Sequence, residues 1–283
     1  MRLPPRPTRL TGPLLAAVLV AAAPAVPEAA GPGAPAASHP APCDRQPDGA
    51  GWTLSSSRAG ASGPDAAFRA YVGNGYLGQR VPPQGTGYAA TGEKTGWPLY
   101  TPRYDGSLVA GLYARDAHTA GNRQVAAAIP TWTALDVTAA GQTFSAATPP
   151  ARISRYRQTL HLRCGLVRTA LTWTAPDGRA TDLVYDVVAD RTDPHMGAVR
   201  LRMTPHWTGE ATVTDVLDGR GARRLAPVGG RGPDSGAPGT VRVGFRTDGT
   251  GTEGAVASTL RPGPGVRPRA GGARPGDGPA RAD

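Results

Sequence analysis

The carboxylates are the side chains with which this chain could carry out acid–base chemistry. Such chemistry needs a carboxyl group with a raised pKa, which requires burial or a neighbouring like charge. The four glutamates are Glu28, Glu93, Glu210 and Glu253. A glycine lies beside each of the last three, in the polar surroundings of a turn. We therefore predict no catalytic residue among them.

Three aspartates recur at a spacing of four residues: Asp182, Asp186 and Asp190. In an extended strand this spacing places all three side chains on one face. Alternation with apolar residues favours a solvated polar sheet face there over a catalytic cluster.

Other kinds of catalytic or cofactor site lack their sequence patterns. No G-x-S-x-G nucleophile elbow occurs. Gly73, Gly75 and Gly78 have the spacing of a dinucleotide-binding motif, but a Gln-Arg-Val-Pro-Pro segment follows instead of a helix. Two cysteines and five scattered histidines offer no metal-ligand spacing. We predict neither a metal nor a cofactor.

The segment Tyr71–Arg80 combines three glycines with two aromatic rings, an amide and a guanidinium. Glycines allow close approach of backbone or ligand, and Asn-Gly is a strong turn signal. A glycine-rich stretch with more aromatic residues follows it. Aromatic rings beside polar side chains often hold sugars, although the same rings also fill the edge of a loop-covered core. The candidate ligand-binding residues are Asn74, Tyr76, Arg80, Trp97 and Tyr100.

Short strands joined by turns must position these residues. Val167, Thr169, Leu171 and Trp173 alternate with more polar neighbours, and Leu183, Tyr185 and Val187 do the same after Ala175-Pro176-Asp177-Gly178. A period of two on both sides of a Pro-Asp-Gly turn predicts a β-hairpin. Leu160–Cys164 and Leu108–Tyr113 are expected to be a half-buried and a buried strand.

Many such strands, about ten residues apart, predict an all-β fold. No sustained helical period occurs outside the first 25 residues. We therefore predict a large antiparallel β-sandwich at residues 51–259. Residues 26–50 are expected to be a Pro/Ala-rich linker and residues 260–283 a disordered basic tail of Pro, Gly and Arg.

The net charge of +10 is spread over the chain. The two termini hold about half of it, and the remaining arginines occur singly along the predicted strands. Nucleic-acid binding usually needs a focused basic stripe. The charge therefore argues against a nucleic-acid partner, and the oligomeric state is left open.

Residues 1–25 have the pattern of a secretory signal peptide. Three arginines precede an apolar run, which ends at Ala23-Pro24-Ala25. The run is too short to span a membrane comfortably. A secreted, extracellular protein without a membrane anchor is expected.

Cys43 and Cys164 are the two cysteines. In an oxidising compartment they could pair and join the start of the domain to a central strand. Two separate thiols, one exposed and one buried, remain the alternative.

Several segments, in order, resemble the N-terminal domain of family 65 glycoside hydrolases, the trehalase and disaccharide phosphorylase group. Tyr71–Arg80 is similar to that family's Asn-Gly-Tyr-Leu-Gly signature, and Ala128–Trp132 to its apolar-Pro-x-Trp strand. Tyr156–Thr169 resembles its hairpin entry, with His161 and Cys164 in place of the usual Asp and Thr. Asp193-Pro194-His195 and Val216–Gly219 continue the order.

The resemblance implies a non-catalytic β-sandwich of a secreted, trehalase-like enzyme of α-glucosidic disaccharides. In the family the catalytic glutamate lies in a following (α/α)6 barrel, so we expect a chain truncated before that barrel and carry over no catalytic residue. An α-glucoside or other carbohydrate would then be a partner through the barrel. The alternative is a stand-alone secreted carbohydrate-binding or interaction module.

Overall fold

The computed structural model describes residues 51–59, 70–88, 107–115, 121–233, 239–263 and 280–282. The chain divides into two compact units, residues 1–39 and 40–283. Every described residue lies in the second unit. The predicted signal peptide and linker therefore fall outside the described residues, as do Glu93, Trp97 and Tyr100.

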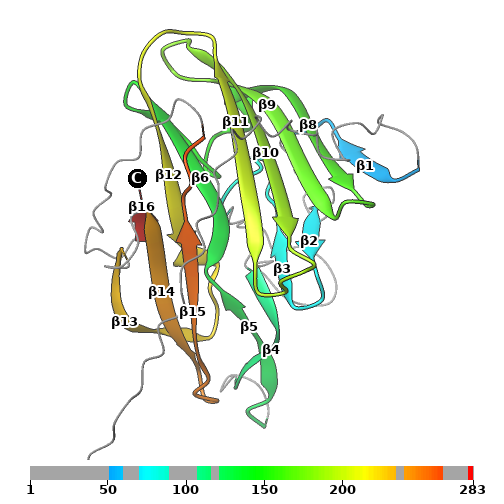
Figure 1. The fold of residues 1–283 in the computed structure, drawn as a ribbon, viewed down its shortest axis with the longest axis vertical. Coiled ribbons are helices and arrows are strands. Elements are labelled where there is room, and N and C mark those ends of the chain that lie inside the picture. The colour runs from blue at the N-terminus through cyan, green and yellow to red at the C-terminus, as the bar shows by residue number, and fades with distance from the viewer. Residues whose placement is uncertain are drawn as a thin grey trace, which may run out of the picture. The chain divides into compact units, whose positions relative to one another are not determined.

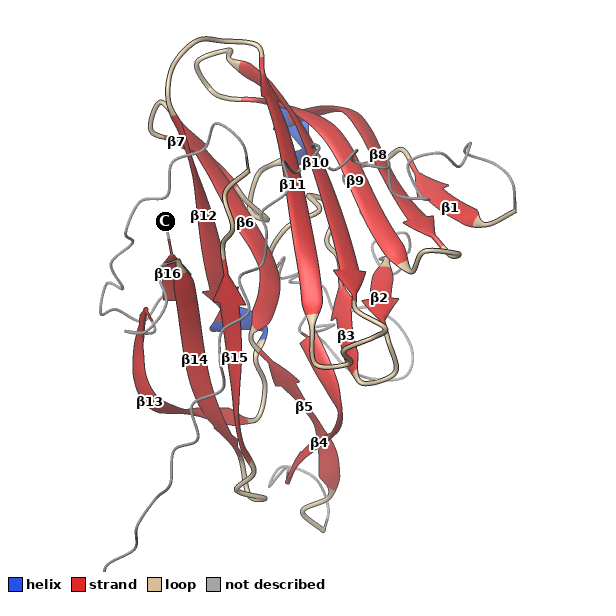
Figure 2. Ribbon diagram, in the orientation of Figure 1, coloured by secondary structure: helices blue, strands red, loops and turns tan. Residues whose placement is uncertain are grey.

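The described part of the chain is built from antiparallel strands (Figures 1 and 2). Sheet A has the order β1 (Thr53–Ser56), β8 (Ile153–His161), β9 (Leu166–Thr174), β10 (Ala180–Ala189), β11 (Gly197–Pro205). Sheet B has the order β2 (Tyr71–Gly73), β3 (Leu77–Arg80), β4 (Ser107–Arg115), β5 (Gln124–Ile129). Sheet C has the order β16 (Ala280–Ala282), β12 (Ala211–Asp218), β6 (Thr131–Ala139), β7 (Gln142–Phe144). Sheet D has the order β13 (Leu225–Pro233), β14 (Thr240–Thr247), β15 (Glu253–Thr259).

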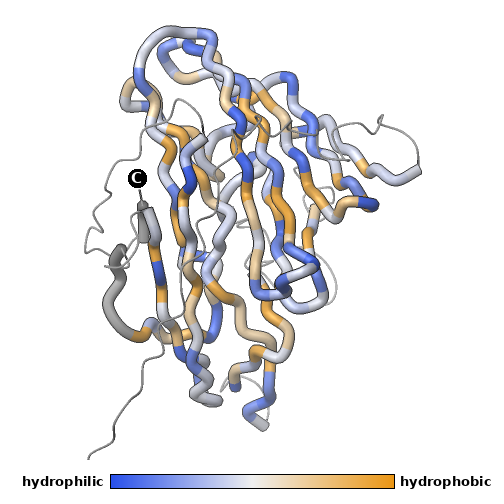
Figure 3. Tube along the Cα trace, viewed as in Figure 1, coloured by the Kyte–Doolittle hydropathy of each residue, from blue (hydrophilic) through white to orange (hydrophobic). Residues whose placement is uncertain are grey.

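Strand β9 and strand β10 form the predicted hairpin. Their register pairs Leu171 with Leu183 and Val167 with Val187, and all four side chains are buried. Between the strands, the amide of Gly178 donates to the carbonyl oxygen of Ala175 at 2.9 Å. The alternation of polar and apolar residues along these strands is visible in Figure 3. The prediction of this hairpin is confirmed.

Three apolar clusters hold the sheets face to face, as in a sandwich. The first lies between sheets A and C and includes Leu171, Trp173, Leu183, Tyr185, Leu135, Val137 and Phe144. The second joins sheets B and D to the end of β12 and includes Leu77, Ile129, Leu217, Val241, Phe245 and Val256. The third joins β2 and the segment after β3 to sheet A through Val72, Val81, Val167 and Val187. The predicted all-β, antiparallel sandwich is confirmed.

Two segments differ from the expected pattern. Strand β8 ends at His161, and the turn that follows leaves Leu162 42% exposed while His161 is buried. Leu108 and Tyr113 of β4 are 41% and 48% exposed instead of buried.

Helical structure is limited to single turns in the described residues. The 3₁₀ turns η3 (Pro150–Arg152) and η4 (Gly219–Gly221) connect strands. No helix among the described residues has the length and apolarity of a membrane span.

Candidate functional site

The side chain of Asn74 joins two turns that are distant in sequence. Its Nδ2 donates to the backbone oxygens of Asp190 at 2.5 Å and Pro194 at 3.0 Å. Its Oδ1 accepts from the backbone amides of Tyr76 at 3.0 Å and Leu77 at 2.8 Å. We call this arrangement the Asn74 clamp: Asn74, the β2–β3 turn (residues 74–76) and the β10–β11 turn (residues 190–196).

Tyr76 and His195 form the outer surface of the clamp. Their ring centroids lie 4.4 Å apart with the planes tilted by 57°. Tyr76 is 36% exposed and the neighbouring Met196 is 55% exposed. Because hydrogen bonds fix both turns, the two rings are presented to solvent from a rigid base.

Asp190 stabilises the β10–β11 turn with its own carboxylate. Oδ1 accepts from the amide and the hydroxyl of Thr192, each at 2.7 Å, and from the amide of Asp193 at 3.3 Å. The hydrogen bonds from Thr192, and a weaker one from Asp193, lower the pKa of Asp190 below its ordinary value. The carboxylate therefore has a structural role in this turn.

The position of the Tyr71 ring accounts for the presence of glycine at two positions of the same segment. A Cβ atom on Gly78 would lie 1.6 Å from the Tyr71 hydroxyl, and one on Gly73 would lie 3.1 Å from Cε1 of the ring. The ring thus lies across both glycines, an arrangement that shields exposed backbone in strands. Burial raises the pKa of Tyr71, and the charge of Arg80, its cross-strand partner, opposes this shift.

The chain then turns into the interior. In the segment of residues 81–88, the Gln84 amide donates to the oxygen of Thr148 at 3.1 Å. The Thr86 hydroxyl contacts the oxygens of Thr133 and Leu135, each at 3.2 Å. Tyr88, at the end of the segment, is 4% exposed and therefore belongs to the core.

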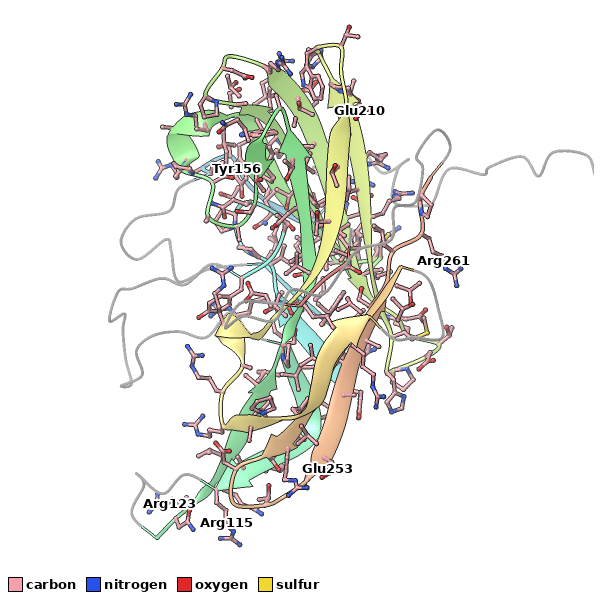
Figure 4. All side chains as sticks on the ribbon, turned by 90° about the vertical axis from the view of Figure 1, so that its left-hand side faces the viewer. Arg115, Arg123, Tyr156, Glu210, Glu253 and Arg261 are labelled. Atoms are coloured by element: carbon pink, nitrogen blue, oxygen red, sulfur yellow. The ribbon has the colours of Figure 1, made fainter. Side chains whose placement is uncertain are left out.

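The glutamates that the structure describes are solvated. Glu253 is paired with Arg246 and its side chain is 56% exposed. Glu210 is also exposed, and the two lie toward opposite ends of the view in Figure 4. Within the described ranges, no group of three or more His, Cys, Asp or Glu side chains could hold a metal ion. These two glutamates cannot act as an acid–base pair.

The aspartates of β10 lie on the outer face of sheet A, as their spacing predicts. Asp186 is 4% exposed and forms ion pairs with Arg168 at 2.6 Å, Arg200 at 2.7 Å and Arg202 at 3.5 Å. Asp182 accepts from the Thr172 hydroxyl at 2.5 Å, and a ring nitrogen of His206 lies 2.8 Å from its other oxygen. This face is a cross-strand ion-pair network.

A family model described as the N-terminal domain of glycosyl hydrolase family 65 matches residues 68–262, which include the clamp and strands β2 to β15. The chain belongs to glycosyl hydrolase family 65.

Curated relatives of this family 65 chain include two fungal acid trehalases. The cell wall acid trehalase ATC1 of Candida albicans is 30% identical over 184 residues, which cover 54% of this chain and 17% of the relative. The acid trehalase of Emericella nidulans is 26% identical over 173 residues, which cover 55% of this chain and 16% of the relative. The matched part is thus about a sixth of each relative's length.

A solved structure described as a kojibiose phosphorylase from the human microbiome is also similar. The TM-score is 0.46 at 13% sequence identity, and the match covers 62% of this chain and 23% of that one.

The structure brings together only part of the predicted site of this family 65 domain. Asn74 and Tyr76 share the clamp, but the amide of Asn74 is engaged by backbone groups of two turns. Arg80 lies at the far end of β3, opposite Tyr71. Trp97 and Tyr100 lie outside the described residues. Ligand binding by the predicted set remains a prediction.

Sequence reasoning missed the contribution of the β10–β11 turn. His195 lies in the turn between β10 and β11. Its contact with Tyr76 depends on two turns meeting across more than a hundred residues, for which a single sequence carries no signal.

Cys164 follows the end of β8. Cys43 lies outside the described residues. The pairing of these two cysteines therefore stays a prediction.

Proposed function

We propose that this domain is the non-catalytic N-terminal β-sandwich of a secreted, trehalase-like enzyme that hydrolyses α-glucosides. The observation that carries the proposal is the match to the family's N-terminal domain over residues 68–262. Relatives named as acid trehalases support the substrate class. Catalysis would be the task of a separate barrel, as the family resemblance implies.

The exposed outer face of sheet B supports a role in packing against such a partner. Tyr71 and Leu108 are 44% and 41% exposed. The register places Leu108 opposite Gly78, over which Tyr71 lies, so that both apolar side chains share this face. Neighbouring exposed apolar side chains are typical of protein contact surfaces.

The experiment is a turnover assay of the purified 283-residue chain with trehalose and with maltose. We expect no glucose release above a heat-treated control. Turnover that copurifies with the chain and is lost in Glu210→Gln or Glu253→Gln would contradict a non-catalytic role. Turnover that persists in both variants would instead indicate a contaminating glucosidase.

Secretion is the second part of the proposal. The N-terminal sequence pattern and the names of relatives, such as a cell wall trehalase and a periplasmic/secreted one, support it. Expression in a secreting host should release a protein whose N-terminus lies just after Ala25. Retention in the cell with residues 1–25 intact would contradict it.

The Tyr76–His195 pair favours a second candidate, a stand-alone carbohydrate-binding module. An exposed ring on a rigid base can stack on the apolar face of a sugar. Trehalose or maltose should then shift the NMR resonances of Tyr76 and His195, and Tyr76→Ala should abolish binding without loss of fold. Absence of any shift at millimolar sugar would rule this candidate out.

A further inference from the structure

Asp215 is a carboxyl group placed in an apolar part of the sandwich. It lies on β12, and its residue is 2% exposed. Two positions before it, Val213 packs against the first apolar cluster. Two positions after it, Leu217 belongs to the second cluster. Asp215 therefore lies where the two apolar regions of the domain meet.

Among the described residues, a side chain of another sheet reaches this carboxyl. The hydroxyl of Ser258, on β15 of sheet D, lies 2.5 Å from Oδ2 of Asp215. Ser258 pairs with Val241, which is fully buried. The hydrogen bond thus joins sheet C to sheet D inside the domain.

The charged residues of β6, β14 and β15 take register positions an odd number of residues away from Asp215 or Ser258, and hence lie on the other face of each strand. Asp136 pairs with Thr214, Arg242 with Ala257, and Arg246 with Glu253. The neighbouring Asp218 is held by Arg220 at 2.5 Å. In strands β6, β14 and β15 the register thus places no cation toward the Asp215 carboxyl.

A buried carboxyl that faces no cation favours its neutral form. Burial raises the pKa of Asp215, and the hydrogen bonds from Ser258 and from the Val216 amide only partly oppose the shift. In the neutral state the acid and Ser258 share a hydrogen bond without a charge in the apolar region.

We propose that Asp215 makes the contact between sheets C and D sensitive to pH, closed when its carboxyl is neutral and weakened when the carboxyl ionises. This device is independent of the proposed function, because it concerns the stability of the domain and not its ligand.

The direction of the effect follows from linkage. The folded-state pKa lies above the unfolded value, so the stabilisation is fully present in acid, below the unfolded pKa. It is lost as the pH rises through the folded pKa. The contact should therefore be strongest in acidic solution.

The test compares melting temperatures of the 283-residue wild type and Asp215→Asn between pH 4 and pH 8. Asparagine resembles the neutral acid at every pH. We expect both to melt within about 1 °C of each other at pH 4, and the variant to melt about 2–4 °C higher at pH 8. A constant offset between the two across the range would overturn the proposal.

Asp190→Asn is the matched control. Asp190 has a lowered pKa in an exposed turn, so its variant should lose stability toward neutral pH instead of gaining it. A gain of the same size in both variants would mean that general charge, and not Asp215, causes the effect. That result would also overturn the proposal.

Hydrogen exchange locates the change. After correction for the intrinsic rate, amides of β12 and β15 in the wild type should lose protection between pH 5 and pH 8, and those of Asp215→Asn should not. Ser258→Ala removes a hydrogen bond to the carboxylate. Amides of β12 and β15 in this variant should therefore lose more protection with rising pH than those of the wild type. Unchanged protection at β12 and β15 in the wild type would contradict a weakened contact between these sheets.

Discussion

The side-chain nitrogen of Asn74 lies 3.0 Å from the backbone oxygen of Pro194, 120 residues further along the chain. The same nitrogen reaches the oxygen of Asp190. Asn74 thus satisfies two carbonyl groups of the β10–β11 turn while it closes its own turn. One amide side chain fixes the spacing of sheets A and B at this point.

Two replacements of Asn74 should destabilise the domain to different extents. Asn74→Asp keeps the acceptor oxygen for Tyr76 and Leu77 and removes the donor, which should cost about 1–2 kcal/mol. Asn74→Ala removes both and should cost about 2–4 kcal/mol. Urea unfolding measures the difference, and equal losses in the two variants would show that only the donor matters.

Gly78→Ala should force the Tyr71 ring off the sheet, because the new methyl group would overlap its hydroxyl. We expect a loss of about 1–3 kcal/mol in unfolding free energy. The matched control is Gly219→Ala, where the methyl group meets nothing within 4 Å. In the background of Tyr71→Ala the cost of Gly78→Ala should largely disappear, and an unchanged cost would contradict the contact.

Asp186→Asn should lower stability at neutral pH and have little effect in acid. Burial alone would raise the pKa of Asp186, but hydrogen bonds from Arg168 and Arg200 outweigh it, and the pKa is lowered. Its stabilisation is therefore present above the unfolded pKa and lost as the pH falls through the folded pKa. We expect about 1–3 kcal/mol at pH 7 by urea unfolding.

The exposed pair of Asp177 and Arg179 provides the comparison for Asp186. Asp177→Asn should change stability by less than about 1 kcal/mol, since solvent screens such pairs. A similar loss in both variants at pH 7 would show that burial adds nothing to the Asp186 network.

Cys43 and Cys164 should be found joined in one peptide after digestion of the non-reduced protein. On the chain-entropy model, a disulfide that closes a loop of this length stabilises by about 4–5 kcal/mol. Cys43→Ser should therefore lower the melting temperature, and a reducing agent should affect the wild type but not the variant. Recovery of Cys164 in a peptide without Cys43 would refute the pairing.

The sequence was sufficient to predict the parts of the fold that depend on local pattern. The hairpin of β9 and β10 has a clear period and a Pro176-Asp177-Gly178 turn, and both appear as expected. Leu108 is as apolar as the buried leucines of that hairpin, yet its side chain is exposed. Whether a strand is covered depends on which sheet lies above it, and a single strand carries no record of its neighbours.

The candidate site shows the same limit. The Asn74-Gly75 turn was predictable because Asn-Gly is a strong turn signal. In the structure Gly75 adopts a positive φ of 94°, as such a turn requires. The commitment of the Asn74 amide to Asp190 and Pro194 was not predictable, because the two turns meet only through the register of two different sheets. Polar residues in a glycine-rich turn look alike whether they bind a ligand or another turn.

The inward course of residues 81–88 has a consequence for limited proteolysis and for the design of fragments of this chain. Surface loops are the usual sites of proteolytic nicking, but here Gln84 and Thr86 are anchored in the core. Limited digestion should spare residues 81–88. A split at Gly85 should yield two fragments that cannot fold independently of each other. In the intact chain, sheet B and the rest of the sandwich should therefore unfold as one cooperative unit.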